Sequence, residues 1–74
     1  MPLVEVKVFE EELNEAQSKD LISRITDAVA AVTSDRLSGV TWVIIDEVKD
    51  GQWGVGGNAL GLDDVKKIMA GAET

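Results

Sequence analysis

The chain opens with Met1-Pro2-Leu3-Val4-Glu5-Val6-Lys7-Val8-Phe9, whose pattern indicates the first element of the fold. Apolar valines alternate with Glu5 and Lys7, and this two-residue period is typical of a β-strand with one covered face. We therefore expect a strand over Leu3–Phe9 that turns its three valines to one face. The chain's only proline, Pro2, stands directly before this strand.

Pro2 allows two interpretations. Removal of Met1 is the expected processing before a small second residue, and it would turn the Pro2 nitrogen into a secondary amine. A free α-amino group titrates near ~7.7–8.0, partial burial disfavours its charged form, and such an amine is a plausible general base. Alternatively, Pro2 only begins the strand, where it costs no ladder hydrogen bond.

The composition restricts the classes of function. The chain has no cysteine and no histidine, which excludes a thiolate or imidazole zinc site and a Cys/Ser–His catalytic pair. A net charge of −7 disfavours nucleic acid as a partner. No signal peptide and no long apolar span is visible, so we expect a cytoplasmic protein that does not enter a membrane.

The length predicts one domain over 1–74 that is marginal by itself. A chain of this size buries only about 60% of its unfolded surface, and without cysteine it has no disulfide to add stability. Yet 45% of its residues are hydrophobic. We therefore expect a homo-oligomer, in which copies bury apolar surface against one another.

A helix is expected after the charge run Glu10–Glu12, a kind of run that most often forms a solvated loop. Asn14 is a suitable N-cap, and Gln17 three residues later completes a capping box. Apolar residues then recur at helical spacing, namely Leu21, Ile22, Ile25, Ala28, Val29 and Val32. Thr33–Arg36 is expected to close the helix, and Leu37–Gly39 to connect it to the next element.

A second strand is expected over Val40–Val48, with a core, Trp42–Ile45, that is apolar on both faces. Two strands joined by a helix form a β-α-β unit, so they should lie parallel. One helix covers only one face of that sheet, and we expect another subunit to cover the other. The fold class is therefore α+β, a small oligomeric β-α-β subunit.

Four glycines among residues 49–57 predict tight turns. Asp50-Gly51 is a strong turn dipeptide, and it predicts a short hairpin arm over Gln52–Val55. The Lys-Ser/Thr of a phosphate-binding loop does not follow, so nucleotide binding is not expected. A short tail helix is expected over Gly61–Ala70, with Gly71 as its stop.

Together these features resemble the 4-oxalocrotonate tautomerase family. The resemblance rests on the opening Met-Pro-Leu-Val, the capped helix, the strand Val43–Glu47 and the stretch Gly51–Gly57, and it covers residues 2–57 as the family core, with 58–74 as a tail extension. It implies a β-α-β subunit that pairs into dimers with a shared four-stranded sheet, three of which form a hexamer. It also implies that Pro2 is the catalytic base, and that Trp53, on a hairpin packed against a neighbouring subunit, lines the pocket near the proline.

The chain departs from the family at two places. Members that act on dicarboxylates carry an arginine just after the first strand, where this chain has Glu11-Glu12. A second arginine usually begins the second strand, where the matching position here is Thr41 or Trp42. A guanidinium binds a carboxylate through a bidentate fork that neither replacement can form, so we expect a substrate with less charge than a dicarboxylate.

We therefore expect a keto–enol tautomerase, an isomerase without metal or organic cofactor, acting on a small enol or 2-keto compound. Pro2 would be the base, and a hydrogen-bond donor would stabilise the developing oxyanion. Of the two arginines, Arg24 is expected to be solvated, and Arg36 is the better anchor. Trp42 belongs either to the pocket wall or, as its apolar strand favours, to the core. The candidate substrate-binding residues are Trp53, Arg36, Trp42, Thr41 and Phe9.

Two other interpretations stay open. The missing arginines suit a non-enzymatic member that keeps the oligomeric fold without the chemistry. Some relatives act as dehalogenases or hydratases through a protonated proline and an activated water, but the acid and cations that such a site needs have no clear place in this sequence.

Overall fold

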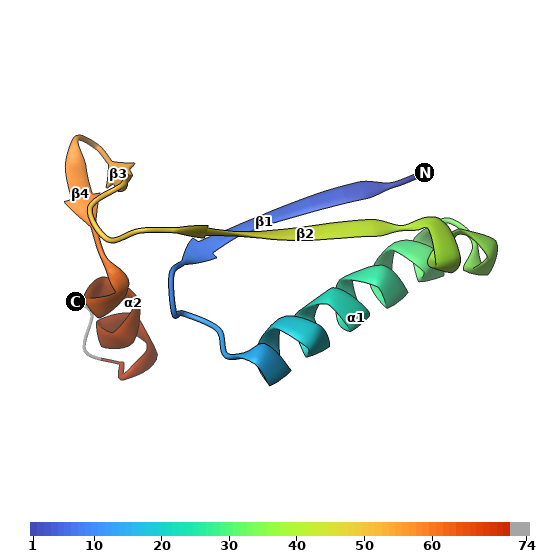
Figure 1. Ribbon diagram of the computed structural model, residues 1–74, viewed down its shortest axis with the longest axis horizontal. Coiled ribbons are helices and arrows are strands. Elements are labelled where there is room, and N and C mark those ends of the chain that lie inside the picture. The colour runs from blue at the N-terminus through green and yellow to red at the C-terminus, as the bar shows by residue number, and fades with distance from the viewer. Residues whose placement is uncertain (72–74) are drawn as a thin grey trace.

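The computed structural model describes residues 1–71, and Figure 1 shows the order of its elements. A strand and a long helix open the chain, a 3₁₀ helix and a second strand follow, and a hairpin and a short helix end it. Their bounds are β1 Leu3–Phe9, α1 Glu15–Val32, η1 Asp35–Val40, β2 Trp42–Val48, β3 Trp53–Val55, β4 Asn58–Leu60 and α2 Leu62–Met69. The predicted α+β class with a β-α-β unit is confirmed. The predicted tail extension over 58–74 is described as far as residue 71, and residues 72–74 lie outside the described part.

β1 and β2 pair in parallel, with Leu3 opposite Trp42 and Phe9 opposite Val48. The bounds of β1 are those that its alternating valines predict. α1 runs along one face of the two strands (Figure 1). Val8 and Ile45 lie on that face, because both line a groove together with residues of α1. Strand side chains alternate between faces, so Leu3 and Trp42 lie on the opposite face.

The start of α1 is the capping box that the sequence predicts. The Asn14 side chain accepts a hydrogen bond from the Gln17 amide at 2.8 Å, and the Gln17 side chain accepts one from the Asn14 amide at 2.9 Å. The predicted apolar stripe is only partly covered, since Val32 is 87% exposed and Ile22 is also exposed. Two strands are too narrow to cover the whole stripe.

The segment between α1 and β2 differs from the prediction. Leu37–Gly39 was expected to be a simple connection, but these residues form part of η1, whose N-cap Ser34 accepts a hydrogen bond from the Arg36 amide at 3.2 Å. Because η1 continues through Val40, β2 begins at Trp42 and not at Val40.

The hairpin forms where the sequence predicts a short arm over Gln52–Val55. Asp50-Gly51 forms the predicted turn, with Gly51 at φ 80°, and leads the chain into β3. The turn between β3 and β4 is Gly56-Gly57, with φ of 58° and 86°. Two consecutive positive φ values define a type I′ turn, whose twist matches that of paired strands.

α2 begins at Leu62 with Gly61 as its N-cap, and Gly71 at φ 73° follows its end, as the predicted stop requires. The hairpin and α2 lie at one end of β1, and the N-terminus lies at the other end (Figure 1). Within residues 1–71, no helix combines the length and the apolar character that crossing a membrane would require.

The subunit buries little of its apolar surface. Among the described residues, the buried hydrophobic side chains are Val8, Phe9 and Ala30. On the face of the sheet away from α1, Leu3 is 55% exposed, Trp42 is 57% exposed, and Ile44 is also exposed. The expectation that Trp42 lies in the core is therefore wrong for the single subunit, because α1 covers only the other face.

Candidate functional site

Pro2 lies at the entrance to β1 and is half-buried. Its carbonyl accepts a hydrogen bond from the Trp42 amide at 2.9 Å, which fixes its backbone against the start of β2. Met1, which precedes it, is 80% exposed. While Met1 is attached, the Pro2 nitrogen is a tertiary amide, with neither an N–H nor a basic lone pair.

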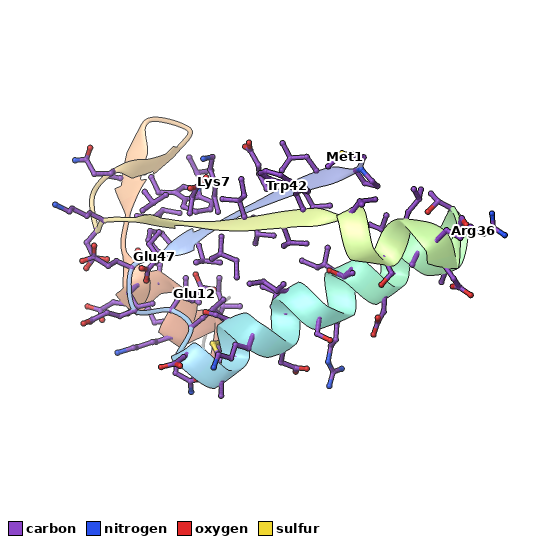
Figure 2. The ribbon with its side chains drawn as sticks, turned by 45° about the vertical axis from the view of Figure 1, so that its right-hand side comes forward. Met1, Lys7, Glu12, Arg36, Trp42 and Glu47 are labelled. Atoms are coloured by element: carbon purple, nitrogen blue, oxygen red, sulfur yellow. The ribbon has the colours of Figure 1, made fainter. Side chains whose placement is uncertain are left out.

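Thr41 and Trp42 lie beside Pro2 at the start of β2. The Thr41 hydroxyl donates a hydrogen bond to the Leu37 carbonyl at 2.7 Å, so this side chain anchors the strand to η1. The Trp42 side chain stands on the face of the sheet opposite α1, on the same side as Met1 (Figure 2). Of the predicted site residues, these two are the ones that the structure places next to Pro2.

The two arginines lie away from this place. Figure 2 shows Arg36 at the outer end of the helical segment, apart from Met1 and Trp42, and its side chain is exposed. The Arg24 Nε donates to the Asp20 carboxylate at 3.0 Å on the surface of α1, which agrees with the prediction that Arg24 is solvated.

Phe9 and Trp53 form an aromatic pair. Phe9 is only 4% exposed, and its ring centroid lies 5.0 Å from that of Trp53, with an angle of 35° between the ring planes. This spacing is within the range that favours aromatic pairs. The pair lies at the far end of β1 from Pro2, and a strand of seven residues at ~3.3 Å each spans about 23 Å. One subunit therefore does not bring Pro2 and Trp53 together.

Carboxylates surround the backbone that follows Phe9. The Glu12 carboxylate accepts a hydrogen bond from the Phe9 amide at 3.0 Å, and the Glu47 carboxylate accepts one from the Glu11 amide at 3.3 Å. Glu11 has φ 69°, in the left-handed region that non-glycine residues seldom adopt. The sequence interpretation of this run as a solvated loop missed both contacts. The three-residue spacing from Phe9 to Glu12 is the signal that could have indicated the contact between the Phe9 amide and the Glu12 carboxylate.

A groove of about 430 Å³ lies between the N-terminal half of α1 and the sheet, lined in part by Val8, Leu13, Ile22, Ile45 and Glu47. Its size is in the range of small-molecule sites. None of the residues that the sequence predicts for the site lines it. The sequence therefore gave no indication of this groove, and the groove and the surroundings of Pro2 are different places.

Carboxylates are the side chains of this chain most suited to holding a metal ion, because it has neither histidine nor cysteine. Among residues 1–71, no three of them lie close enough together to ligate one.

Comparison with known proteins points to one family. A family model described as tautomerase enzyme matches residues 2–63. The chain is 40% identical over 57 residues to a probable tautomerase of Staphylococcus aureus, covering 77% of this chain and 90% of that protein. It is 33% identical over 60 residues to a probable tautomerase of Dickeya dadantii, covering 81% of this chain and 88% of that protein.

Solved structures agree with these relatives. The crystal structure of DmpI from Helicobacter pylori superimposes with a TM-score of 0.70 at 28% identity, covering 78% of this chain and 94% of that one. The crystal structure of YwhB, a homologue of 4-oxalocrotonate tautomerase, gives a TM-score of 0.67 at 28% identity and covers 77% of this chain and 90% of that one.

Proposed function

The chain belongs to the tautomerase family, and from this premise we propose that it is a keto–enol tautomerase whose general base is the amine of Pro2. Family membership supports a tautomerase-type isomerase activity. The observation that carries the assignment to Pro2 is that the family match begins at residue 2. The structure adds that this residue is half-buried and that its backbone is held by Trp42.

The proposal requires that Met1 is removed. Removal of Met1, which is exposed, replaces the tertiary amide by a secondary amine. The neutral amine takes a proton from an enol hydroxyl or from an acidic carbon and becomes a cation. It then returns a proton to another carbon of the same substrate, so that the amine is neutral again and the product is an isomer of the substrate.

The negative charge that develops on the carbonyl oxygen needs a hydrogen-bond donor. The Trp42 indole lies at the same end of the sheet as Pro2, and its side chain is exposed. We propose the indole N–H of Trp42 or of Trp53 as this donor, with Thr41 supporting the start of β2 through its hydrogen bond to Leu37. Arg36 points outward in its own subunit, so a role for it would require a neighbouring copy.

The aromatic wall would come from a second copy of the chain. Phe9 and Trp53 lie about 23 Å from Pro2 by the length of β1, so the pocket would join the start of one β1 to the end of another. The exposed Leu3, Trp42 and Ile44 support such an assembly, because this apolar face is open in the single subunit. We propose a homo-oligomer, with the hexamer of three dimers that the family resemblance implies.

The substrate class follows from the charges near Phe9 and Trp53. Just after β1, where a dicarboxylate-processing site would offer a guanidinium, this chain has Glu11 and Glu12. The Glu12 carboxylate accepts from the Phe9 amide, and the Glu47 carboxylate of β2 accepts from the Glu11 amide. A second carboxylate on the substrate would be repelled there and would gain no bidentate partner. We therefore propose a small enol or 2-keto compound with at most one carboxylate.

One alternative has an observation in its favour. Acidic residues stand after β1, and neither arginine lies near Pro2, so the protein could keep the family fold without catalysis. In that case neither removal of Met1 nor the identity of residue 2 would change any enol reaction.

Ketonisation of phenylenolpyruvate by the processed protein, beside a Pro2→Ala variant, tests the proposal. General base catalysis contributes about 10²–10⁴-fold, so we expect the variant to lose on the order of 100-fold in kcat or more. Intact mass establishes that Met1 is absent from both proteins, and circular dichroism that both are folded. Equal rates for the two proteins would remove Pro2 from the mechanism, and no rate with any enol would favour the non-enzymatic alternative.

A further inference from the structure

Asp50 joins the segment before the hairpin to the helix after it. Its Oδ1 accepts a hydrogen bond at 2.9 Å from the backbone amide of Leu62, the first residue of α2. The carboxylate also lies against Gly61, where a Cβ atom would be 3.2 to 3.4 Å from its atoms. One side chain thus holds together two points that are 12 residues apart in the sequence.

The residues between these two points form the hairpin that carries Trp53. The Gly51 amide donates to the Leu60 carbonyl at 3.0 Å, and Trp53 pairs with Leu60 in the ladder. The Asp50–Leu62 contact therefore lies at the end of the hairpin opposite its turn, next to the pair formed by Trp53 and Leu60.

The hairpin and α2 need such a contact. β3 and β4 have three residues each, and an isolated two-stranded hairpin is marginal in water. α2 has only eight residues, which is too short for a stable isolated helix. The Asp50 carboxylate satisfies a free amide in the first turn of α2, where negative charge is also favoured by the helix dipole.

We propose that Asp50 is a positioning residue for substrate binding, because it holds Trp53 against Phe9 and so fixes the aromatic wall of the pocket. This inference rests on the proposed function, in which Trp53 lines the pocket. It also gives α2 a role, since the helix provides the amide to which Asp50 is anchored. The sequence analysis interpreted Asp50 only as a turn residue.

Three variants of the processed protein test this role. Asp50→Ala removes the acceptor, Asp50→Asn keeps an oxygen acceptor without the charge, and Asp63→Ala removes a carboxylate from the first turn of α2 while leaving the Asp50 contact in place. Labelling with 5-fluorotryptophan gives one ¹⁹F resonance for each of the two tryptophans. A Trp42→Phe protein assigns them.

We expect Asp50→Ala to shift or broaden the Trp53 resonance and to leave the Trp42 resonance in place. We expect KM for phenylenolpyruvate to rise about fivefold, which is the change in affinity that the net contribution of one hydrogen bond corresponds to. The value of kcat and the pH dependence set by Pro2 should stay the same. Asp50→Asn should restore both the resonance and KM, and Asp63→Ala should change neither.

The outcomes separate this inference from the proposed function. An active wild-type protein together with an Asp50→Ala variant of unchanged KM would overturn the inference alone, as would equal defects in Asp50→Asn and Asp50→Ala. An inactive processed wild-type protein would overturn the proposed function and the inference with it. If Asp50→Ala does not fold, Gly61→Ala, whose methyl group presses on the Asp50 carboxylate, should still shift the Trp53 resonance. An unshifted resonance there would contradict the proposal.

Discussion

The two ends of β1 are built in different ways. At its end, Phe9 is buried and packs against Trp53, and its amide is bound by the Glu12 carboxylate. At its start, the Pro2 carbonyl accepts a hydrogen bond from the Trp42 amide, and the nearby Leu3 and Trp42 side chains are mostly exposed. The same strand thus has one end that the subunit completes and one end that it leaves open.

This difference indicates how a site could be assembled. The proposed base lies at the open end, and the proposed aromatic wall lies at the completed end. If two copies place opposite ends of β1 together, the rigid aromatic pair of one copy closes the open end of the other. In that arrangement, the small core around Phe9 would stabilise the part of the site that each subunit supplies to its neighbour.

Phe9→Ala should have the largest effect, because it removes the centre of the completed end. Truncation of a buried phenylalanine costs about 3–5 kcal/mol, and here the contact with Trp53 is lost as well. Urea unfolding at a fixed protein concentration, followed by tryptophan fluorescence, measures the change.

Phe9→Leu is the control for this prediction, since swaps that nearly conserve volume usually cost less than about 1.5 kcal/mol. Equal destabilisation by both substitutions would mean that the aromatic pair, and not the filled volume, holds this end together. A loss below 1 kcal/mol for Phe9→Ala would contradict the assignment of Phe9 to the core.

The open end should be the end that responds to pH. Protonated Pro2 cannot accept a proton, so kcat/KM of the processed protein should fall about tenfold for each pH unit below the pKa of that amine. A variant with one extra residue before Pro2 has an amide there, and its rate should stay low, on the order of 100-fold below the processed protein at the pH optimum. Measured profiles of the same shape for both proteins would place the base elsewhere.

The sequence predicts the elements whose signals are local. The alternation in Leu3–Phe9 gives the correct bounds of β1, and the Asn14–Gln17 pair gives the correct start of α1. The turn at Asp50-Gly51 and the arm within Gln52–Val55 are also as predicted. The return strand β4 was not predicted, because Asn58–Leu60 is too short to show a two-residue period. η1 was missed because its short-range hydrogen bonds follow no hydrophobic period.

The candidate site is less predictable than the fold, because it depends on where side chains point. Arg36 is the better candidate anchor by sequence, but η1 directs it outward in its own subunit, so only a pocket shared with a neighbouring copy could use it. Trp42 was expected in the core, but one helix leaves its face of the sheet open. Pro2 and Trp53 were linked by family resemblance alone, and the length of β1 separates them within a subunit.

Leu3→Ala tests whether a neighbouring copy covers the open end of β1. Full burial of a leucine side chain contributes about 1.5–3 kcal/mol, and Leu3 is 55% exposed in the subunit. If a neighbouring copy covers this face, the substitution should weaken assembly by about 1 kcal/mol per subunit. Sedimentation over a range of concentrations should then show that the assembly dissociates at a higher protein concentration than the wild-type assembly does.

Val55→Ala is the control, because Val55 is 56% exposed on the hairpin and not on the sheet face. An unchanged dissociation curve for Leu3→Ala would show that no copy covers this part of the sheet.

The smallest effect is expected between the two ends, where the Lys7 ammonium lies 3.1 Å from the Asp46 carboxylate. The two side chains are 59% and 45% exposed in the subunit, and exposed ion pairs contribute about 0.2–1 kcal/mol. A double-mutant cycle with Lys7→Met and Asp46→Asn should give a coupling energy in this range, reduced by salt, when it is measured under conditions that keep subunits apart.

Both residues share the sheet face of Leu3 and Trp42, so assembly would remove water from the pair. A coupling that grows and loses its salt dependence at concentrations where the protein assembles would place the interface across the middle of β1. A coupling that stays the same would confine the contact between copies to the ends of the strand.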